Sequence, residues 1–308
     1  MTSEILTPEQ RFALLRRTLK WAEEKTDFYR TAFAEAGVGH ASVKSFADMA
    51  RLPFWEDAVK EEGADAPFFM LTLPLSGILR MSVLSDGEGK SRIYCYTQGD
   101  AARHVQTAAD ILRSCGVNRA SMVLLCGDFT DSRTLDLQYA LEMIGAAVLP
   151  CENRNSAAVR RFLQAAVPDT VIVWEQALPV LAEAMDDLCV SRVITVGRHI
   201  APEGGGRQAA VRMGRRHTHI FTRAELGALI GCSCADGRAV HVEERLFFAE
   251  VVDQAGRSMT ADGAAGELVL STIAAEAMPV LRCRTGLHVR LARGTCACGS
   301  GQLCIMEE

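Results

Sequence analysis

Four residues of this sequence combine the donor atoms that zinc prefers. Cys234 precedes His241 by seven residues, and Cys296 and Cys298 form a Cys-x-Cys pair. Together they give four ligands of the right softness for tetrahedral Zn²⁺, and a closed four-ligand site would be structural. Cys232 could substitute for Cys234. The alternative is a chance cluster of reduced cysteines, because the chain contains 11 cysteines.

Composition and charge limit the classes of protein that these residues could serve. A chain of 308 residues with 49% hydrophobic content can bury a large core, and its net charge of −5 offers no basic surface for nucleic acid. No apolar run reaches the roughly 18 residues of a membrane span. The first residues, MTSEILTPEQRF, lack the basic and apolar regions of a secretory signal. Free cysteines without an export signal indicate a reducing compartment, so we expect a cytoplasmic protein.

The spacing of apolar residues predicts an α/β protein with a parallel sheet covered by helices. Residues 8–37 favour one or two helices, and apolar strands then alternate with amphipathic helices. After about residue 240, short strands joined by turns predict a β-rich subdomain. The expected strands are 79–84, 92–96, 121–126, 146–150, 170–174, 191–196 and 217–221, and the expected helices are 99–115, 132–144, 156–166 and 176–187.

Several segments resemble the phenylacetate–CoA ligase family, a branch of the AMP-forming adenylate-forming enzymes. The strongest is GELVLSTIAAEAMPVLRCRTG at 266–286, and YALEMIGAAVLPC at 139–151 resembles a helix–strand unit of the family. FYRTAFAEAGV at 28–38 and SFADMARLPFWED at 45–57 resemble its N-terminal helical segment. The order and spacing of these segments indicate the family more strongly than any one of them alone.

The resemblance implies the large N-terminal domain of an adenylate-forming enzyme. The expected parts are an N-terminal helical segment at 1–78, an α/β core with the ligand pocket at 79–235 and a β-rich subdomain at 236–308. The sequence stops 22 residues after the signature, so we expect the family's small C-terminal domain to be absent. Ligands of such a fold bind at the carboxyl ends of the sheet strands. Trp174 and Phe129 could line an aryl or acyl slot there, or simply pack.

The family's phosphate loop corresponds to LSDGEGKSRIYCYT at 84–97. In the family, hydroxyls and backbone N–H groups of this loop wrap the phosphates of ATP. Asp86 and Glu88 oppose that role, because two carboxylates would face a polyanion. The alternative is a glycine-rich hairpin turn between two strands. The loop residues that could hold ATP are Ser85, Gly87, Gly89 and Lys90.

The family's Tyr-Gly-Leu-Ser/Thr-Glu motif corresponds to FTRAE at 221–225. The resemblance assigns Glu225 to Mg²⁺ in catalysis and Thr222 to the nucleotide, while Ala224 lacks the family's hydroxyl. A glutamate at a strand-to-helix junction can also be a favourable charge near a helix N-terminus. At the adenine position, residues 197–200 read GRHI where the family has Gly-Ala-Glu-Pro, so the acceptor carboxylate is missing.

The family's Arg-x-Arg-Thr-x-Asp motif corresponds to RCRTGL at 282–287. The resemblance implies that Arg282 contacts the cofactor and that Arg284 acts in catalysis near the phosphate. Both side chains would project to one face of a strand. Leu287 stands where the family has an aspartate that accepts hydrogen bonds from ribose, and a leucine side chain accepts none.

The cysteine motif also matches the family. CACG at 296–299 resembles a Cys-Pro-Cys-Gly turn, and the stretch with Cys234 and His241 resembles a Glu-Cys-…-Gly-Leu-His stretch. The resemblance therefore implies a structural zinc at Cys234, His241, Cys296 and Cys298.

Two functional hypotheses follow. The first is an AMP-forming carboxylate–CoA ligase-like protein for an aryl or acyl acid, with ATP, Mg²⁺ and coenzyme A, that is incomplete or degenerate. A separate chain could then supply the C-terminal domain. The second is a non-catalytic, zinc-containing binding or regulatory protein on the same fold. The expected partner is a small carboxylic acid or a nucleotide, not a nucleic acid or a membrane, and a homodimer is compatible with both. The residues leave open whether the chain is an enzyme.

Overall fold

The computed structural model divides the chain into two compact units, which we describe separately. The β-rich unit comprises Met1–Ala102 and Val242–Glu308, and the α/β unit comprises Arg103–His241. The residues that the structure describes are 6–56, 68–85, 91–152, 160–161, 164–178, 190–201, 216–234, 237, 239–294, 296 and 298–308.

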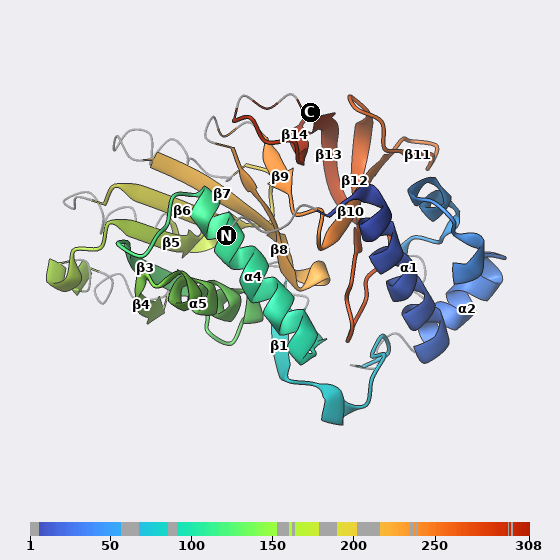
Figure 1. Cartoon of the computed structure of the whole chain (residues 1–308), viewed down its shortest axis with the longest axis horizontal. Helices are drawn as coiled ribbons and strands as arrows, with labels where there is room; N and C mark the ends of the chain where they lie inside the picture. Colours follow the sequence, from blue (N-terminus) through green and yellow to red (C-terminus); the bar gives the residue numbers. More distant parts are fainter. Residues whose placement is uncertain are drawn as a thin grey trace. The chain divides into compact units, whose positions relative to one another are not determined.

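The α/β unit is built on a mixed sheet with the strand order β9-β8-β7-β6-β5-β3-β4 (Figure 1). Strands β3 to β7 run parallel, and β8 pairs antiparallel with β7. The strands are β3 (Met122–Gly127), β4 (Ala147–Glu152), β5 (Thr170–Trp174), β6 (Arg192–Gly197), β7 (Arg216–Arg223), β8 (Ala228–Ser233) and β9 (Val240–Val242).

Both faces of this sheet are apolar, which is typical of parallel strands covered on two sides. One core joins β3 to the helix α5 (Ser132–Ile144), whose Leu137, Ala140 and Leu141 are fully buried. The opposite face has its own core, which includes Leu124 and Val173. The helix α4 (Gln98–Ser114) begins in the β-rich unit and continues into the α/β unit, where its buried residues join the first core.

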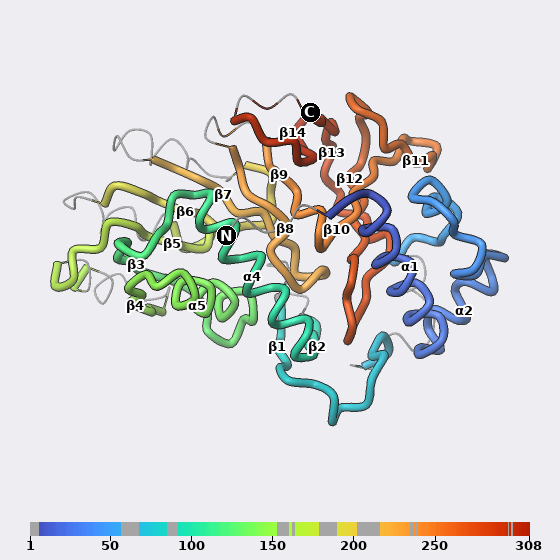
Figure 2. Tube along the Cα trace, in the orientation of Figure 1, coloured from blue at the N-terminus to red at the C-terminus, as the bar shows by residue number. Residues whose placement is uncertain are grey.

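The β-rich unit combines N-terminal helices with antiparallel strands. Helix α1 (Pro8–Lys25) starts at a capping box between Thr7 and Gln10, and α2 (Asp27–Glu35) follows it. Strands β1 (Arg80–Ser85) and β2 (Ser91–Tyr96) form an antiparallel pair, which Figure 2 traces as neighbouring segments. The other elements are β10 (Phe247–Val252), β11 (Ser258–Met259), β12 (Ala265–Thr272), β13 (Cys283–Arg293), β14 (Leu303–Glu307), η1 (His40–Ser42), η2 (Phe46–Arg51) and η3 (Leu75–Gly77).

Buried polar groups hold the segment 276–281 of the β-rich unit in place. The Asp100 carboxylate accepts hydrogen bonds from the backbone N–H groups of Glu276 and Ala277, at 2.9 and 3.0 Å. The Tyr29 hydroxyl donates to the carbonyl of Pro279 at 2.8 Å. Hydrogen bonds to buried charged groups stabilise by about 1.5–3 kcal/mol each, so this signature segment is firmly anchored.

The structure confirms the predicted fold class. The expected strand 170–174 and the expected helix 132–144 agree with β5 and α5 in both bounds, and the other expected strands up to residue 221 differ by a residue or two. The expected helices at 156–166 and 176–187 fall largely outside the described residues. The expected domain boundaries after residues 78 and 235 remain predictions, because a division of the chain into compact units does not by itself define domains.

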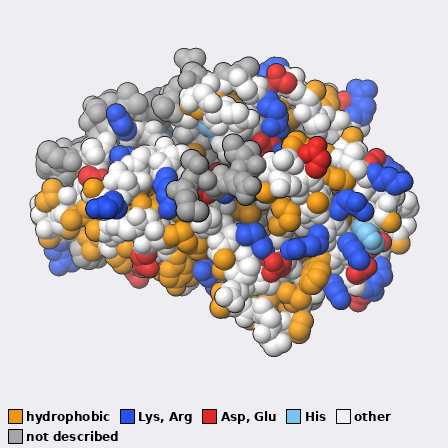
Figure 3. Space-filling view, viewed as in Figure 1, with side chains coloured by type: hydrophobic (Ala, Val, Ile, Leu, Met, Phe, Trp, Pro, Cys, Tyr) orange, Lys and Arg blue, Asp and Glu red, His pale blue; other side chains and the backbone are white. Residues whose placement is uncertain are grey.

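The surface charge and the hydropathy of the helices bear on two expectations from composition, namely no basic surface and no membrane span. Figure 3 shows Lys and Arg side chains interspersed with Asp and Glu on the face that it displays. Among the described residues, no helix is both long enough and apolar enough to cross a membrane.

Candidate functional site

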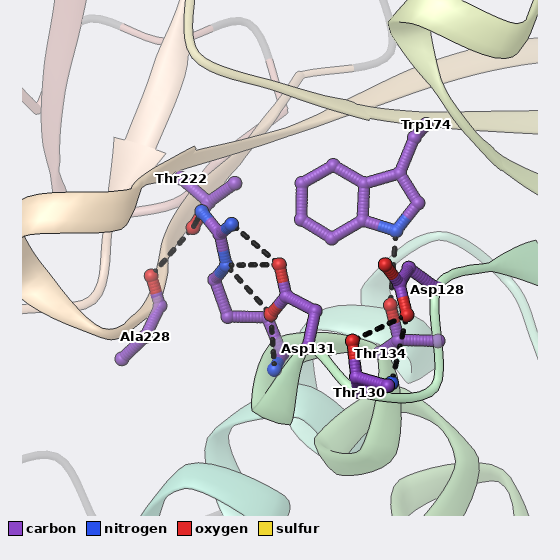
Figure 4. Close-up of polar contacts among 8 residues, drawn as sticks. Asp128, Thr130, Asp131, Thr134, Trp174, Thr222 and Ala228 are labelled. Carbon is purple, nitrogen blue, oxygen red and sulfur yellow. Dashed lines mark hydrogen bonds and ion pairs between the residues drawn. The ribbon is translucent and has the colours of Figure 1, made fainter. Parts of the chain in front are cut away.

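Polar side chains collect at the carboxyl ends of the parallel strands of the α/β unit, where open α/β sheets bind their ligands. The turn between β3 and α5 is the first contributor. Asp128 accepts hydrogen bonds from the backbone N–H and the hydroxyl of Thr130, at 2.8 and 2.6 Å (Figure 4). Asp131 is the N-cap of α5 and accepts from the N–H of Arg133 at 2.9 Å.

Arg133 is the central residue of this site. Its side chain is only 5% exposed, and its Nη2 and Nε atoms donate to the Asp131 carboxylate at 2.6 and 3.0 Å. Its guanidinium lies 4.7 Å from the centre of the Trp174 ring, a cation–π distance. The arginine is therefore neutralised by one neighbour and covered by another, as a buried charge requires.

Trp174 ends β5 and belongs to the core as well as to the site. Its indole Nε1 donates to the hydroxyl of Thr134 at 3.0 Å, and the residue is 9% exposed. Phe129 packs against the same core. Both aromatic residues therefore pack in the core, and their role in lining an aryl or acyl slot stays a prediction.

The motif at 221–225 is engaged by the chain itself. The Thr222 hydroxyl donates to the carbonyl of Ala228 at 2.7 Å and accepts a long hydrogen bond of 3.5 Å from Arg133 (Figure 4). Glu225 lies in the short helix η5 (Ala224–Leu226), and its carboxylate pairs with Arg223 at 3.1 Å. The Mg²⁺ role of Glu225 and the nucleotide role of Thr222 stay predictions, and the observed partners compete with both.

A carboxylate that the sequence does not signal lies at the end of β6. Glu175, in the short helix η4 (Glu175–Ala177), accepts from the backbone N–H of Arg198 at 3.2 Å and lies 3.1 Å from His199 Nδ1. A Cβ at Gly197 would meet this carboxylate at 2.1 Å, so a larger residue there would force the Glu175 side chain to move. Glu175 thus brings a carboxylate to the loop at 197–200, from the neighbouring strand.

A histidine pair connects β6 and β7. His219 Nε2 lies 2.9 Å from the carbonyl of His199, which can only accept, so this nitrogen carries the proton. His219 Nδ1 then accepts the hydroxyl proton of Thr195 at 2.8 Å, and Thr195 accepts from His217 Nε2 at 2.9 Å. Burial lowers the pKa of His219 to about 4, so the ring is neutral near pH 7.

In the β-rich unit, Arg282 is an internal anchor. Its side chain is 3% exposed, and its Nε donates to Glu250 at 2.7 Å. Its Nη1 donates to the carbonyls of Ala50 and Leu52, and its guanidinium lies 4.2 Å from the centre of the Phe54 ring. These contacts tie β10 to the chain around residues 50–54.

The two arginines of the RCRT motif do not share a strand face. Arg282 precedes β13 and has a φ of +54°, a left-handed conformation that non-glycine residues rarely adopt. The Arg284 side chain is 45% exposed and pairs with Glu267, with Nε 2.9 Å from Oε2. The positive φ interrupts the alternation of a strand, which explains the difference in burial. Both guanidinium groups still lie against the Phe54 ring, at 4.2 and 5.2 Å from its centre, and the anion-facing role of the pair remains a prediction.

The predicted phosphate loop is described only at its borders. Ser85 ends β1 and pairs with Ser91 of β2 in an antiparallel register, so the loop connects the two strands of a hairpin. Gly87, Gly89 and Lys90 lie outside the described residues. The phosphate role of the loop remains a prediction.

The predicted zinc ligands occupy two turns, one in each unit. In the α/β unit, Cys234 follows β8, and its N–H donates to the carbonyl of Ala239 at 2.9 Å, while His241 lies in β9. Both side chains are buried. In the β-rich unit, the backbone carbonyl of Cys296 accepts from the N–H of Gly299 at 3.0 Å. The backbone nitrogen of Ser300 lies 3.5 Å from the Cys298 sulfur.

The sequence placed the candidate pocket near 84–91, 126–132, 174–176, 197–200 and 221–226, which includes Asp131 and Glu175 without a role for either, and it missed Arg133. The polar run DFTDSRT, which begins two residues after Cys126 at the end of an apolar strand, carried the signal for Arg133. Side chains at the carboxyl end of a parallel strand are candidates for binding, whether or not they match a motif.

The chain is similar to curated ligases over most of its length. It is 29% identical over 294 residues to the phenylacetate-coenzyme A ligase of Aromatoleum evansii, and 27% identical over 296 residues to that of Escherichia coli (strain K12). Each comparison covers 91% of this chain, and the chain spans 66% of the length of these relatives. No protein-family model matches the chain.

Solved structures agree on the fold. The open conformation of 2-hydroxyisobutyryl-CoA ligase, in complex with 2-HIB-AMP and CoA, is 18% identical with a TM-score of 0.86 over 97% of this chain and 73% of that chain. Its postadenylation state gives a TM-score of 0.86 at 17% identity, over 97% of this chain and 66% of that chain. The fold is therefore that of adenylate-forming CoA ligases, and the predicted resemblance to phenylacetate–CoA ligases is confirmed.

Proposed function

We propose that this chain is an AMP-forming carboxylate–CoA ligase-like protein with a degenerate nucleotide site. It binds a small aryl or acyl acid at the carboxyl ends of β3, β5 and β7, and it adenylates that acid poorly or not at all. The ligase part rests on the similarity to phenylacetate-coenzyme A ligases over 91% of the chain. The degenerate part rests on the partners of the side chains that the resemblance assigns to nucleotide.

The observation that carries the proposal is that those side chains are already engaged within their own units. Thr222 donates its hydroxyl proton to Ala228, and Glu225 pairs with Arg223. Arg282 is buried on Glu250, and Arg284 pairs with Glu267. ATP would have to displace these partners, and each hydrogen bond left unmet in a buried site costs roughly 1–3 kcal/mol.

These residues fit ATP and Mg²⁺ poorly, so we derive no catalytic step through either. A Mg²⁺ ion needs carboxylate oxygens and usually keeps several waters, whereas Glu225 faces a guanidinium. Leu287 offers no acceptor for ribose. The acid would bind beside Arg133 and Trp174, because they lie at the carboxyl ends of the parallel strands, where open α/β sheets bind their ligands.

ATP–pyrophosphate exchange with a panel of aryl and acyl acids tests the proposal. We expect exchange no higher than the background without acid, because adenylate formation requires a competent nucleotide site. Tryptophan fluorescence titrated with the same acids should respond, since Trp174 lines the proposed acid site, and the signal should be lost in Trp174→Phe. Robust acid-dependent exchange would contradict the degenerate site, and the absence of any acid binding would contradict the ligase-like part.

A structural zinc is the second part of the proposal. The donor set fits, because Cys234, His241, Cys296 and Cys298 form a group that could hold a metal ion, each offering one ligand atom. Three thiols and one imidazole complete a tetrahedral Zn²⁺ shell with no open position for substrate. The ion would cross-link two turns and stabilise only the folded chain.

Metal analysis of freshly purified chain, never exposed to chelator, tests this part. We expect about one zinc per chain, and a melting temperature that falls after removal with a strong chelator and recovers with Zn²⁺. Cys298→Ala should lose the metal, whereas Cys95→Ala, which alters a buried thiol elsewhere, should keep it. Metal-free protein at full stability would contradict the zinc site.

The alternative function is a non-catalytic zinc-containing binding or regulatory protein. The group of four metal donors favours it, because the donor residues are complete while the nucleotide contacts are not. The two proposals differ in acid binding, which the ligase-like protein retains and a purely structural relative does not require.

A further inference from the structure

Two cysteines lie directly opposite each other on neighbouring parallel strands of the α/β unit. Cys126 of β3 and Cys151 of β4 are Cα partners in the register of that pair. Both side chains belong to the same core on one face of the sheet, at 0% and 5% exposure. Parallel strands lie about 4.8 Å apart, which is inside the range of Cα distances that a disulfide spans.

The two thiols already interact. The proximity of the Cys126 thiol lowers the pKa of Cys151, whereas the proximity of Cys151 and burial raise the pKa of Cys126. The Cys151 thiol donates to the carbonyl of Glu152 at 3.5 Å. Thiolate character makes a cysteine reactive toward oxidants, so Cys151 is the more reactive partner. It also lies on β4, the strand at the edge of this sheet, whereas Cys126 lies on an inner strand.

Backbone movement at Cys126 would reach the strand-end site. The next residue, Gly127, packs so tightly that a Cβ there would lie 2.6 Å from Thr134 Cγ2 and 3.1 Å from Trp174 Nε1. Directly paired side chains of parallel strands point the same way, so bridging them requires the two backbones to shift. Gly127 cannot follow such a shift without displacing Thr134 and the indole of Trp174.

We propose that Cys126 and Cys151 are a redox modification site, which a hydroperoxide converts to a reversible disulfide. The Cys151 thiolate attacks one oxygen of hydrogen peroxide, the O–O bond breaks, and hydroxide leaves and takes a proton to form water. The sulfenic acid at Cys151 is then attacked by the Cys126 sulfur. The S–S bond forms, the S–O bond breaks, and the second water carries away the Cys126 proton. Two thiols are oxidised while the peroxide is reduced to two waters.

A second thiol pair in this unit provides an internal comparison. Cys115, just after α4, lies beside Cys232 of β8, and this neighbour and burial raise the pKa of Cys115. The Cys232 sulfur also lies 3.4 Å from the Ser114 hydroxyl oxygen, within hydrogen-bond distance. A helix end and a strand have no register that fixes their separation, so we expect this pair to stay reduced under mild oxidation.

Peptide mapping of the full chain tests the proposal without any substitution. Protein with its zinc in place is treated with a small excess of hydrogen peroxide, denatured, alkylated and digested under non-reducing conditions. We expect one cross-linked peptide that joins Cys126 to Cys151 and disappears with dithiothreitol. Tryptophan fluorescence should change in parallel and recover on reduction. Cys126 and Cys151 both alkylated as in untreated protein, or a bond at Cys115–Cys232 instead, would overturn the proposal.

Two variants separate the modification site from general oxidation. Cys151→Ser removes the attacking sulfur, so it should abolish both the cross-link and the fluorescence change. Trp174→Phe keeps the thiols, so it should keep the cross-link but lose the fluorescence change. A fluorescence change that persists in Cys151→Ser would sever the proposed link between the dithiol and the strand-end site. These readouts are independent of ligase activity.

Discussion

The two units each bury an arginine on a carboxylate, and the two pairs differ in what surrounds them. In the β-rich unit, Arg282 and Glu250 are 3% and 1% exposed, and two backbone carbonyls accept hydrogen bonds from Nη1, while Nη2 has no hydrogen-bond partner among the described residues. In the α/β unit, Arg133 is 5% exposed, but its partner Asp131 is 14% exposed and also caps α5.

This difference distinguishes Arg282, which connects parts of the fold, from Arg133, which lies at the ligand-binding end of the sheet. Arg282 connects segments far apart in the chain, including residues 50–54, and its side chain is only 3% exposed. Arg133 lies at the ends of parallel strands beside the Trp174 indole, and its guanidinium donates to Asp131 and Thr222. A family motif therefore pointed to the arginine that is structural, while the arginine at the ligand-binding end of the sheet belongs to no motif.

The largest expected effect comes from Arg282→Ala. Removing one partner of a buried ion pair leaves Glu250 charged and unpaired, which costs about 3–5 kcal/mol of the free energy of unfolding. Urea denaturation should show that loss. Arg284→Ala is the matched control: its side chain is 45% exposed, and a surface ion pair contributes about 0–1 kcal/mol. Equal losses for the two variants would break the comparison.

Acidification should weaken the α/β unit through His219. The pKa of this histidine falls from 6.5 to about 4 on folding, so the unfolded chain binds the proton first as the pH is lowered. The neutral His219 ring costs the folded chain nothing above pH 6.5. As the pH falls from 6.5 to about 4, the free energy of unfolding decreases by roughly 3 kcal/mol. Urea denaturation between pH 7 and pH 4 measures it. His219→Gln has no imidazole to titrate, and an unchanged pH dependence in that variant would contradict the assignment.

Arg133→Ala should cost less than Arg282→Ala, about 1–3 kcal/mol, because Asp131 is partly exposed and keeps its N-cap hydrogen bond. The substitution should also uncover one face of Trp174 and change its fluorescence. Arg133→Lys keeps the charge but not the planar stacking, so it should recover part of the stability and little of the fluorescence. A loss as large as that of Arg282→Ala would show that Arg133 is a second anchor.

The smallest effect is expected for Glu225→Gln. The carboxylate is 24% exposed and pairs with Arg223 near the surface, so its removal should change stability by no more than about 1 kcal/mol. ATP binding should not change either, because Glu225 is not free to hold Mg²⁺. A marked drop in Mg²⁺-dependent ATP affinity would show that Glu225 holds Mg²⁺, as the resemblance implies, and would contradict the degeneracy of this part of the nucleotide site.

The sequence predicted the sheet well and the site partly. Strand 170–174 and helix 132–144 could be located because their apolar runs end abruptly at polar residues or glycine. Thr222 was identified by its motif, and it does lie at the strand ends. Arg282 was identified by its motif too, but its burial was not, because its partner Glu250 lies 32 residues away.

The contacts that the sequence could not reveal depend on which strands pair and in which register. Glu175 approaches the loop at 197–200 from a neighbouring strand, and only the parallel pairing of β5 with β6 brings the two together. The Cys126–Cys151 contact likewise requires the exact register of β3 and β4, and a shift of one residue would place the thiols on opposite faces.

Calorimetric titration of the purified chain with Mg²⁺-ATP tests the central claim most directly. Thr222 and Arg282 are buried and engaged by the chain itself, and Leu287 offers no acceptor to ribose, so two or three unmet hydrogen bonds should weaken the affinity for ATP by a few orders of magnitude. We predict a dissociation constant on the order of 1 mM or no measurable heat. Saturable binding with a dissociation constant on the order of 1 µM would contradict the degenerate nucleotide site.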